Sequence, residues 1–222
     1  VKVLRALRPF DASTCSHTTF RGQYDGYRAA EGVDPNSQTA TFAAIRLMID
    51  NWRWNGVPFY LRSGKALSCR TTQIVVQFQA PPAVLFERKR PLQGNRLVIQ
   101  IQPAEGIQLQ FHTKVPDAGM DLCFTDLNVV FRREFSNDIP DAYQRLLLDA
   151  AMGDASLFAR ADEVELAWSV IDPIIQGWST DNAPPLASYE TGDWGPEAST
   201  EWMRDQGREW FDVCPVLTLP HG

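Results

Sequence analysis

Three stretches of this chain alternate apolar and polar side chains, and this pattern restricts the possible fold more than any other feature of the sequence. They cover residues 72–79, 97–102 and 107–112. Alternation with a period of two is typical of a β-strand that has one buried face. The short link at residues 104–106, which ends in glycine, predicts that the second and third runs form a hairpin. We expect the face that carries the larger apolar side chains to be buried: Ile74, Val76, Phe78, Leu97, Ile99, Ile101, Ile107, Leu109 and Phe111.

Further runs have the β-branched and aromatic composition of strands. They lie at residues 18–24, 41–49, 57–61 and 123–131. The run at 41–49 is ambiguous, because its alanine, leucine and methionine residues favour a helix equally well from propensity alone.

Apolar residues at helical spacing come later in the chain. One stripe covers residues 142–150, and Gly153 can end that helix. A second helix is expected to start at a capping box formed by Asp162 and Glu165, and to be disturbed at Pro173. Strands grouped before helices predict an α+β fold, with a large, mostly antiparallel β-sheet and helices packed on one face.

A glycine turn flanked by three cations follows the strand-like run at residues 57–61. Gly64 allows a sharp bend, after which Arg62, Lys65 and Arg70 can converge on a small target. Lysine offers a mobile point charge and arginine a planar fork of donors, a mixture that suits a phosphorylated metabolite better than a long polyanion. Solvated surface charge is the alternative interpretation, and the residues alone leave both open.

Several segments, taken in order, carry a family resemblance. They are R-G-Q-Y at 21–24, T-A-T-F-A-A-I-R-L at 39–47, V-P-F-Y-L-R-S-G-K at 57–65, N-R-L-V-I-Q-I-Q-P at 95–103, P-D-A-Y-Q-R-L-L-L-D-A-A-M-G-D at 140–154 and L-F-A-R-A-D-E-V-E-L-A-W at 157–168. Their order and spacing closely resemble the C-terminal domain of the glucose-6-phosphate dehydrogenase family, over about residues 1–178. The resemblance implies that residues 41–49 form a strand, and it agrees with an α+β fold.

The resemblance also implies roles for individual residues. Lys65 in R-S-G-K matches the family's lysine that contacts the sugar phosphate, and Gln102 in I-Q-I-Q-P matches a glutamine that contacts the substrate. Arg70 occupies a nearby basic position and completes the expected substrate-binding set for glucose 6-phosphate. Arg62 and Asp50 are interpreted as structural or solvated charges.

The family's dinucleotide-binding half has no counterpart in this sequence. No G-x-G-x-x-G turn occurs, and nothing matches the family's aspartate and histidine pair or its D-H-Y-L-G-K-like segment. The resemblance therefore implies a C-terminal fragment of an NADP-dependent enzyme that oxidises glucose 6-phosphate to 6-phosphogluconolactone in the oxidative pentose phosphate pathway. We expect NADP to be bound mainly by the absent N-terminal domain, and the fragment to be inactive alone. A second, structural NADP site found in some relatives is doubtful, because Thr71, Val75 and Gln100 stand at its basic positions.

Neither the histidines nor the cysteines predict a catalytic or metal site. His17, His112 and His221 have no carboxylate motif around them, so no catalytic residue is expected in this chain. The cysteines lie far apart without C-x-x-C or H-x-x-x-H spacing, so we expect no metal site and no disulfide scaffold: Cys15, Cys69, Cys123 and Cys214.

Charge and hydropathy exclude some partners. The formal net charge is −6, so nucleic acid is an unfavourable partner. No apolar run reaches the roughly 18 residues that crossing a bilayer needs, and the start lacks a signal-peptide core. Scattered cysteines fit a reducing compartment, so a cytoplasmic location is expected.

The whole chain, residues 1–222, is expected to form one substrate-binding and dimerisation domain with a packed tail at 179–222, in which a short helix lies around 200–208. In the family this sheet contributes to a dimer, so its glutamine-rich face either meets a second subunit of a homodimer or faces solvent. Two other functions stay open. The chain could be a free-standing module that binds a sugar phosphate or assembles other proteins, or a purely structural dimerisation domain.

Overall fold

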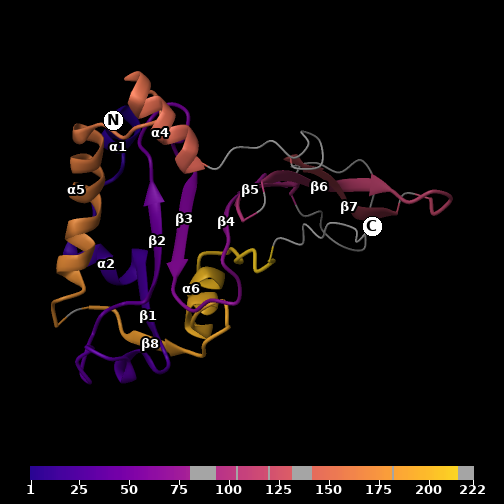
Figure 1. Ribbon diagram of the computed structural model, residues 1–222. Coiled ribbons are helices and arrows are strands. Elements are labelled where there is room, and N and C mark those ends of the chain that lie inside the picture. Colours follow the sequence, from indigo (N-terminus) through magenta and orange to yellow (C-terminus); the bar gives the residue numbers. More distant parts are fainter. Residues whose placement is uncertain (81–93, 104, 120, 132–141, 182, 215–222) are drawn as a thin grey trace. The chain divides into compact units, whose positions relative to one another are not determined.

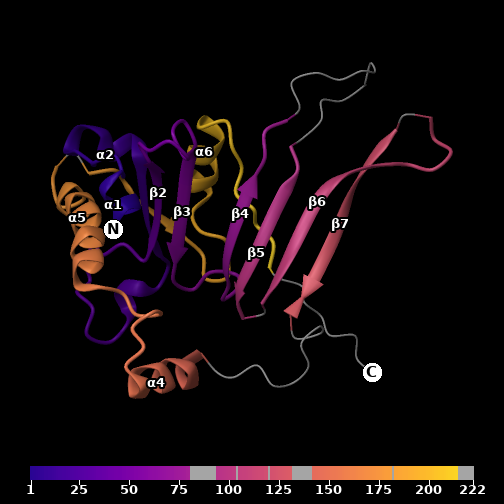
Figure 2. The same cartoon turned by 90° about the horizontal axis from the view of Figure 1, so that it is seen from above.

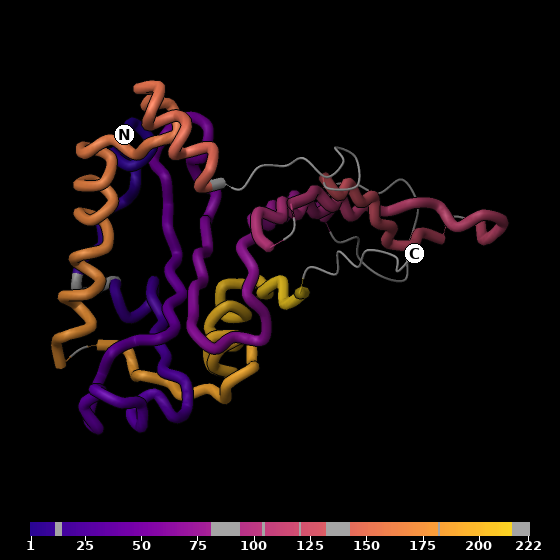
Figure 3. Tube along the Cα trace, in the orientation of Figure 1, coloured from indigo at the N-terminus to yellow at the C-terminus, as the bar shows by residue number. Residues whose placement is uncertain are grey.

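The computed structural model describes residues 1–80, 94–103, 105–119, 121–131, 142–181 and 183–214 (Figure 1). The chain divides into two compact units. The first contains Val1–Ser68 and Leu146–Trp210, and the second contains Cys69–Arg145 and Phe211–Gly222. The colours of Figure 3 show that the first unit combines an early and a late part of the chain.

A four-stranded sheet forms the centre of the first unit. Its strands are β1 (Thr19–Tyr24), β2 (Phe42–Met48), β3 (Pro58–Gly64) and β8 (Leu186–Tyr189), in the order β3-β2-β1-β8. The first three pair antiparallel, which confirms the strands predicted at 18–24, 41–49 and 57–61. Strand β8 was not predicted, and it pairs parallel to β1.

Helices cover both faces of this sheet (Figures 1 and 2). Helix α2 (Ala12–Thr18) and helix α5 (Ala161–Gly177) lie on one face, where Trp178 Nε1 donates a hydrogen bond to Thr19 Oγ1 at 2.9 Å. Helix α6 (Glu197–Asp205) brings Trp202 to the other face. Among the described residues, the other helical segments are α1 (Lys2–Arg5), the 3₁₀ turn η1 (Tyr27–Ala29) and α4 (Ala142–Met152).

The core on the α6 face is aromatic. Phe42, Ala44 and Tyr189 are buried together, and the Phe42 ring meets the Tyr189 ring edge to face with centroids 5.8 Å apart. Gly195 has a φ of +112°, and a Cβ there would overlap the Phe42 ring. Glycine at this position therefore allows the segment before α6 to pass directly over the core.

Arg21 ties the other face of the sheet together. Its Nε donates to the carbonyl oxygen of Pro184 at 2.7 Å and its Nη1 to that of Trp178 at 2.9 Å. Burial lowers the pKa of this guanidinium from its usual value, because desolvation disfavours the charged form. The R-G-Q-Y segment thus links β1 to the chain that follows α5.

A second four-stranded sheet forms the second unit. Its strands are β4 (Thr72–Gln77), β5 (Arg96–Gln102), β6 (Gly106–Lys114) and β7 (Leu122–Val130). Neighbouring strands pair antiparallel in the order β4-β5-β6-β7, so the predicted hairpin of β5 and β6 is confirmed. The α+β class is confirmed as well. The arrangement differs from the expected one in two respects: the strands form two sheets instead of one large sheet, and helices lie on both faces of the first.

The face of the second sheet that was expected to be buried is exposed. Ile74 on β4, Ile107 on β6 and Val129 on β7 are all exposed, whereas Val98 on the opposite face is fully buried. The chain after α6 packs on that opposite face, where the Arg96 guanidinium lies 4.9 Å from the centre of the Phe211 ring. Alternation predicted the strands correctly but assigned burial to the wrong face.

Local predictions in the helices need correction too. Helix α5 begins after Arg160, which caps it without a side-chain hydrogen bond, so the capping box is wrong. Asp162 instead forms an exposed ion pair with Arg160 at 2.9 Å. The helix also continues through Pro173 to Gly177. Helix α4 does end where Gly153 adopts a positive φ of 72°, as predicted.

Cys69 and Cys214 form a disulfide within the second unit. The disulfide connects the start of the second unit, next to Arg70, with the segment that follows Phe211. Cys15 and Cys123 are free thiols. One bridge is not a disulfide scaffold, and the reducing compartment inferred from the cysteines stays a prediction.

Candidate functional site

The turn that follows β3 presents Lys65. The Lys65 amide donates to the carbonyl oxygen of Thr41 at 2.8 Å, and the Tyr189 hydroxyl donates to the carbonyl oxygen of Lys65, also at 2.8 Å. Thr41 and Tyr189 are themselves buried. The backbone of Lys65 is therefore fixed from the core while its side chain is exposed.

The bend in this turn is made by Ala66 and not by Gly64. Ala66 has a φ of 52°, in the left-handed region that non-glycine residues rarely adopt. The Gly192 amide holds that conformation by donating to the Ala66 carbonyl oxygen at 2.8 Å. Gly64 serves close packing, because a Cβ there would lie 3.0 Å from the Phe42 ring. The predicted role of Gly64 is thus wrong, although the turn is present.

Tyr189 was not identified from the sequence. It lies on β8, 124 positions after Lys65, and its hydroxyl also lies 3.2 Å from Thr41 Oγ1. Burial is the main cause that raises the pKa of this phenol above its usual value, so the hydroxyl stays protonated and can donate at neutral pH. No local sequence pattern indicates a contact across such a separation.

The two charges interpreted as structural or solvated have partners. The Arg62 guanidinium lies 4.6 Å from the centre of the Trp210 ring and 5.3 Å from that of Trp194. Asp50 forms an ion pair with Arg8 at 2.8 Å. Arg62 thus holds the aromatic segment around α6, and Asp50 belongs to an exposed pair of small energetic weight.

Arg70 and Gln102 belong to the second unit, whereas Lys65 belongs to the first. Gln102 pairs with Thr72 in the register of β4 and β5, and Thr71 Oγ1 donates to the Gln102 carbonyl oxygen at 3.1 Å. The structure therefore brings Arg70 and Gln102 to the same end of this strand pair. Both side chains are exposed, and the peptide bond between Gln102 and Pro103 is cis.

The cations of the candidate site are electrostatically uncompensated in the described part of the chain. Neither Lys65 nor Arg70 has a carboxylate oxygen within 4.0 Å among those residues. An exposed cation without an internal partner is available to attract an anion. Lys65 combines this availability with a fixed backbone.

In the described residues, metal-ligating side chains are not grouped, and the positions expected for a second dinucleotide carry no cation. Within them, no group of three or more His, Cys, Asp or Glu side chains is close enough to hold a metal. At the positions where some relatives carry cations, Thr71 bonds to Gln102, Val75 pairs with Val98, and Gln100 is uncharged. These three residues do not fit a second NADP, since none can neutralise a phosphate.

Among the helices of the described chain, none has both the length and the apolar composition that a membrane span requires. Two histidines lie within the described residues. His17 is exposed in α2, and the His112 ring lies edge to face with Phe124, with centroids 4.6 Å apart. His221 lies outside the described residues.

Comparison with known proteins gives a consistent answer. The family model described as "Glucose-6-phosphate dehydrogenase, C-terminal domain" matches residues 1–211. A glucose-6-phosphate 1-dehydrogenase of Dickeya dadantii is 43% identical over 229 aligned residues, which cover 96% of this chain and 46% of the relative. One of Treponema pallidum is 42% identical, with 98% of this chain and 44% of the relative covered.

Solved structures agree with the sequence comparisons. A glucose-6-phosphate 1-dehydrogenase from Mycobacterium avium superposes with a TM-score of 0.77 at 36% identity, covering 98% of this chain and 44% of that one. A glucose-6-phosphate dehydrogenase in complex with its substrate glucose-6-phosphate gives a TM-score of 0.82 at 34% identity, covering 94% and 44%. The chain spans less than half the length of these relatives.

Proposed function

This chain belongs to the family of glucose-6-phosphate dehydrogenase C-terminal domains, and from that premise we propose that it holds the phosphate end of glucose 6-phosphate. Lys65 carries the proposal, because its backbone is fixed by one hydrogen bond donated to Thr41 and one accepted from Tyr189, while its ammonium group is free to meet an anion. Arg70, which precedes β4, and Gln102, which ends β5, are proposed as further donors to the substrate. A related structure bound to glucose-6-phosphate supports this choice of ligand.

The proposed activity of the complete protein is oxidation of glucose 6-phosphate to its lactone, with NADP as hydride acceptor. This chain contributes binding and orientation to that reaction. Holding a substrate in reactive geometry can lower a barrier by roughly 7–11 kcal/mol in favourable cases, and anchoring the phosphate is one part of that effect. No described side chain is assigned a proton transfer, and the hydride acceptor binds outside this chain in the proposal.

Replacing Lys65 with alanine tests the anchoring role directly. We expect the affinity of this chain for glucose 6-phosphate to fall about ten- to a hundredfold, because one charge-assisted hydrogen bond to the phosphate is lost. Isothermal titration calorimetry measures the change. Lys2→Ala is the matched control, since Lys2 is also exposed and belongs to the same unit. If Lys65→Ala binds glucose 6-phosphate with unchanged affinity, the anchoring role is wrong and the turn has a structural role only.

Replacing Tyr189 with phenylalanine tests how the turn is positioned. The ring stays, but the hydroxyl that donates to the Lys65 carbonyl oxygen is removed. We expect the free energy of unfolding to fall by about 1 kcal/mol and the affinity for glucose 6-phosphate to fall several-fold. The change should have no further effect on affinity in the Lys65→Ala background. An equal loss in both backgrounds would contradict a positioning role.

We also propose that the chain forms a homodimer through the exposed face of the second sheet. Two cross-strand rows run over all four strands on that face, Ile74–Ile99–Ile107–Val129 and Val76–Leu97–Leu109–Leu127. Contiguous apolar patches of this kind are rare on monomers and are typical of protein interfaces. The exposed rows favour this apolar face, instead of the glutamine-rich face, as the surface that meets the second subunit.

A further inference from the structure

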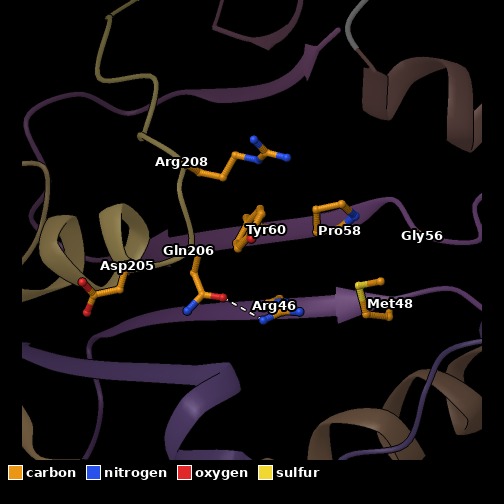
Figure 4. Close-up of a pocket in the computed structure, with 8 residues that line it drawn as sticks. All are labelled: Arg46, Met48, Gly56, Pro58, Tyr60, Asp205, Gln206 and Arg208. Atoms are coloured by element: carbon orange, nitrogen blue, oxygen red, sulfur yellow. Dashed lines mark hydrogen bonds between the residues drawn. The ribbon is translucent and has the colours of Figure 1, made fainter. Parts of the chain in front are cut away.

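A cavity of about 380 Å³ lies in the first unit, away from the turn that carries Lys65. The pairing of β2 with β3 runs from Phe42–Gly64 at one end to Met48–Pro58 at the other. Lys65 follows the first end, whereas Met48 and Pro58 line the cavity at the second. Its lining residues are shown in Figure 4: Arg46, Met48, Gly56, Pro58, Tyr60, Asp205, Gln206 and Arg208.

Arg46 contributes a guanidinium group whose hydrogen bonding is incomplete. Its Nη1 donates to Gln206 Oε1 at 2.7 Å. Its Nε is buried and has no hydrogen-bond partner among the described residues. A buried donor without an acceptor is unfavourable, and such groups in native proteins commonly meet a water molecule or a bound ion. Arg46 lines the cavity, so its guanidinium group is placed to meet an acceptor there.

A second guanidinium group lies across the cavity. Arg208 is exposed, and within the described chain its guanidinium makes one hydrogen bond, from Nη1 to the adjacent Gly207 carbonyl oxygen at 3.4 Å, near the upper distance limit. Neither Arg46 nor Arg208 has a carboxylate within 4.0 Å in that part of the chain. Asp205 also lines the cavity, but its carboxylate is directed away from both guanidinium groups in Figure 4. The interior is thus positively charged.

Tyr60 adds a neutral donor between the two arginines (Figure 4). Its ring is held edge to face by Trp202 and Trp210, with centroids 6.1 and 6.5 Å away. Its hydroxyl makes no hydrogen bond to the residues that the structure describes. A rigid ring with a free hydroxyl fixes the position of one donor in the cavity.

We propose that this cavity binds the oxyanion group of a small metabolite, a phosphate or a carboxylate. Arginine forks match both groups, and Arg46, Tyr60 and Arg208 all offer donors in the lining of the cavity. The volume suits a small molecule. A long polyanion is disfavoured, because the whole chain carries a net charge of −6 and repels it. The site is separate from the proposed glucose 6-phosphate contacts and does not depend on them.

Calorimetric titration of the whole chain tests the proposal. Inorganic phosphate and citrate are titrated separately at ionic strength matched with sodium chloride. The Lys65→Ala chain is used, so that binding at the other turn does not contribute. We expect saturable binding of at least one anion. Preference for phosphate or for citrate then identifies the group, whereas saturable binding of neither overturns the proposal.

Variants locate the binding. Arg208→Gln and Tyr60→Phe are expected to weaken it about tenfold or more, because each removes one donor from the anion. Arg204→Gln is the matched control, since Arg204 is exposed on α6 and does not line the cavity. Arg46→Gln should abolish binding, but it also removes the hydrogen bond from Arg46 to Gln206, so Arg208→Gln and Tyr60→Phe are the decisive variants. Equal affinity in Arg208→Gln, Tyr60→Phe and Arg204→Gln would show that the anion binds elsewhere.

Discussion

Replacing Leu127 with aspartate is expected to convert the proposed homodimer into a monomer. Leu127 is 57% exposed and ends one of the two apolar rows of the second sheet. A carboxylate buried there would lose its hydration without gaining a partner, which is among the most unfavourable changes at an interface. We expect the dimer dissociation constant to rise by more than about a hundredfold, measured by sedimentation velocity over a range of chain concentrations.

The control for this experiment is the next residue along the strand. Asn128→Asp adds the same charge, but Asn128 faces the other side of β7, opposite Gln108. It should leave the dissociation constant nearly unchanged. A chain that sediments as a monomer at tens of micromolar, or equal effects of the two variants, would contradict dimerisation through the apolar face.

Replacing Phe42 with alanine is expected to lower the free energy of unfolding of the first unit by about 3–5 kcal/mol. The Phe42 side chain is 1% exposed, and its ring contacts both Phe20 and Tyr189 edge to face. Gly64 and Gly195 come close to the same ring, so their backbones leave little freedom for the cavity to collapse. The cost should therefore lie in the upper part of that range.

Urea unfolding followed by tryptophan fluorescence measures this change. Every tryptophan of the chain belongs to the first unit, so the signal reports on that unit alone. Trp52→Ala provides a control, because its fully exposed side chain should contribute less than about 0.5 kcal/mol. A loss below about 1 kcal/mol in Phe42→Ala would mean that the aromatic cluster is not the core of this unit.

The period of the hydrophobic pattern predicted the strands of the second sheet well, but it led to the wrong prediction of which face is buried. Alternation fixes which residues share a face and where a hairpin forms, and both were confirmed for β5 and β6. It does not say which face is covered. Aliphatic rows are normally interpreted as buried, but here the tail covers the other face through Phe211.

Elements that depend on distant partners were missed. Strand β8 has only four residues, and it exists because it pairs in parallel with β1, far earlier in the chain. Helix α2 lies in a Ser/Thr-rich segment whose residues are weak helix formers, so packing against α5 stabilises it instead of propensity. Local reasoning cannot find either element.

In the candidate site, too, the local feature was predicted and the contacts between distant residues were missed. Lys65 was predicted from its motif, and the structure presents it at an exposed turn. The buried residues that fix the turn, Thr41 and Tyr189, were not predicted, because their contacts with Lys65 cross the chain. The left-handed conformation of Ala66 was also missed. The bend was predicted at Gly64, because glycine adopts a sharp turn with less strain than alanine.

Strand β8 has a consequence for how the protein is made. The ribosome synthesises residues 69–145, which hold all four strands of the second sheet, before β8, although the second unit also needs the segment from Phe211 onward. The hydrogen bond from the Tyr189 hydroxyl to the Lys65 carbonyl oxygen can form only after residue 189 has left the ribosomal exit tunnel. Until then the edge of β1 that β8 will cover stays open, and an open strand edge is a template for pairing with other chains.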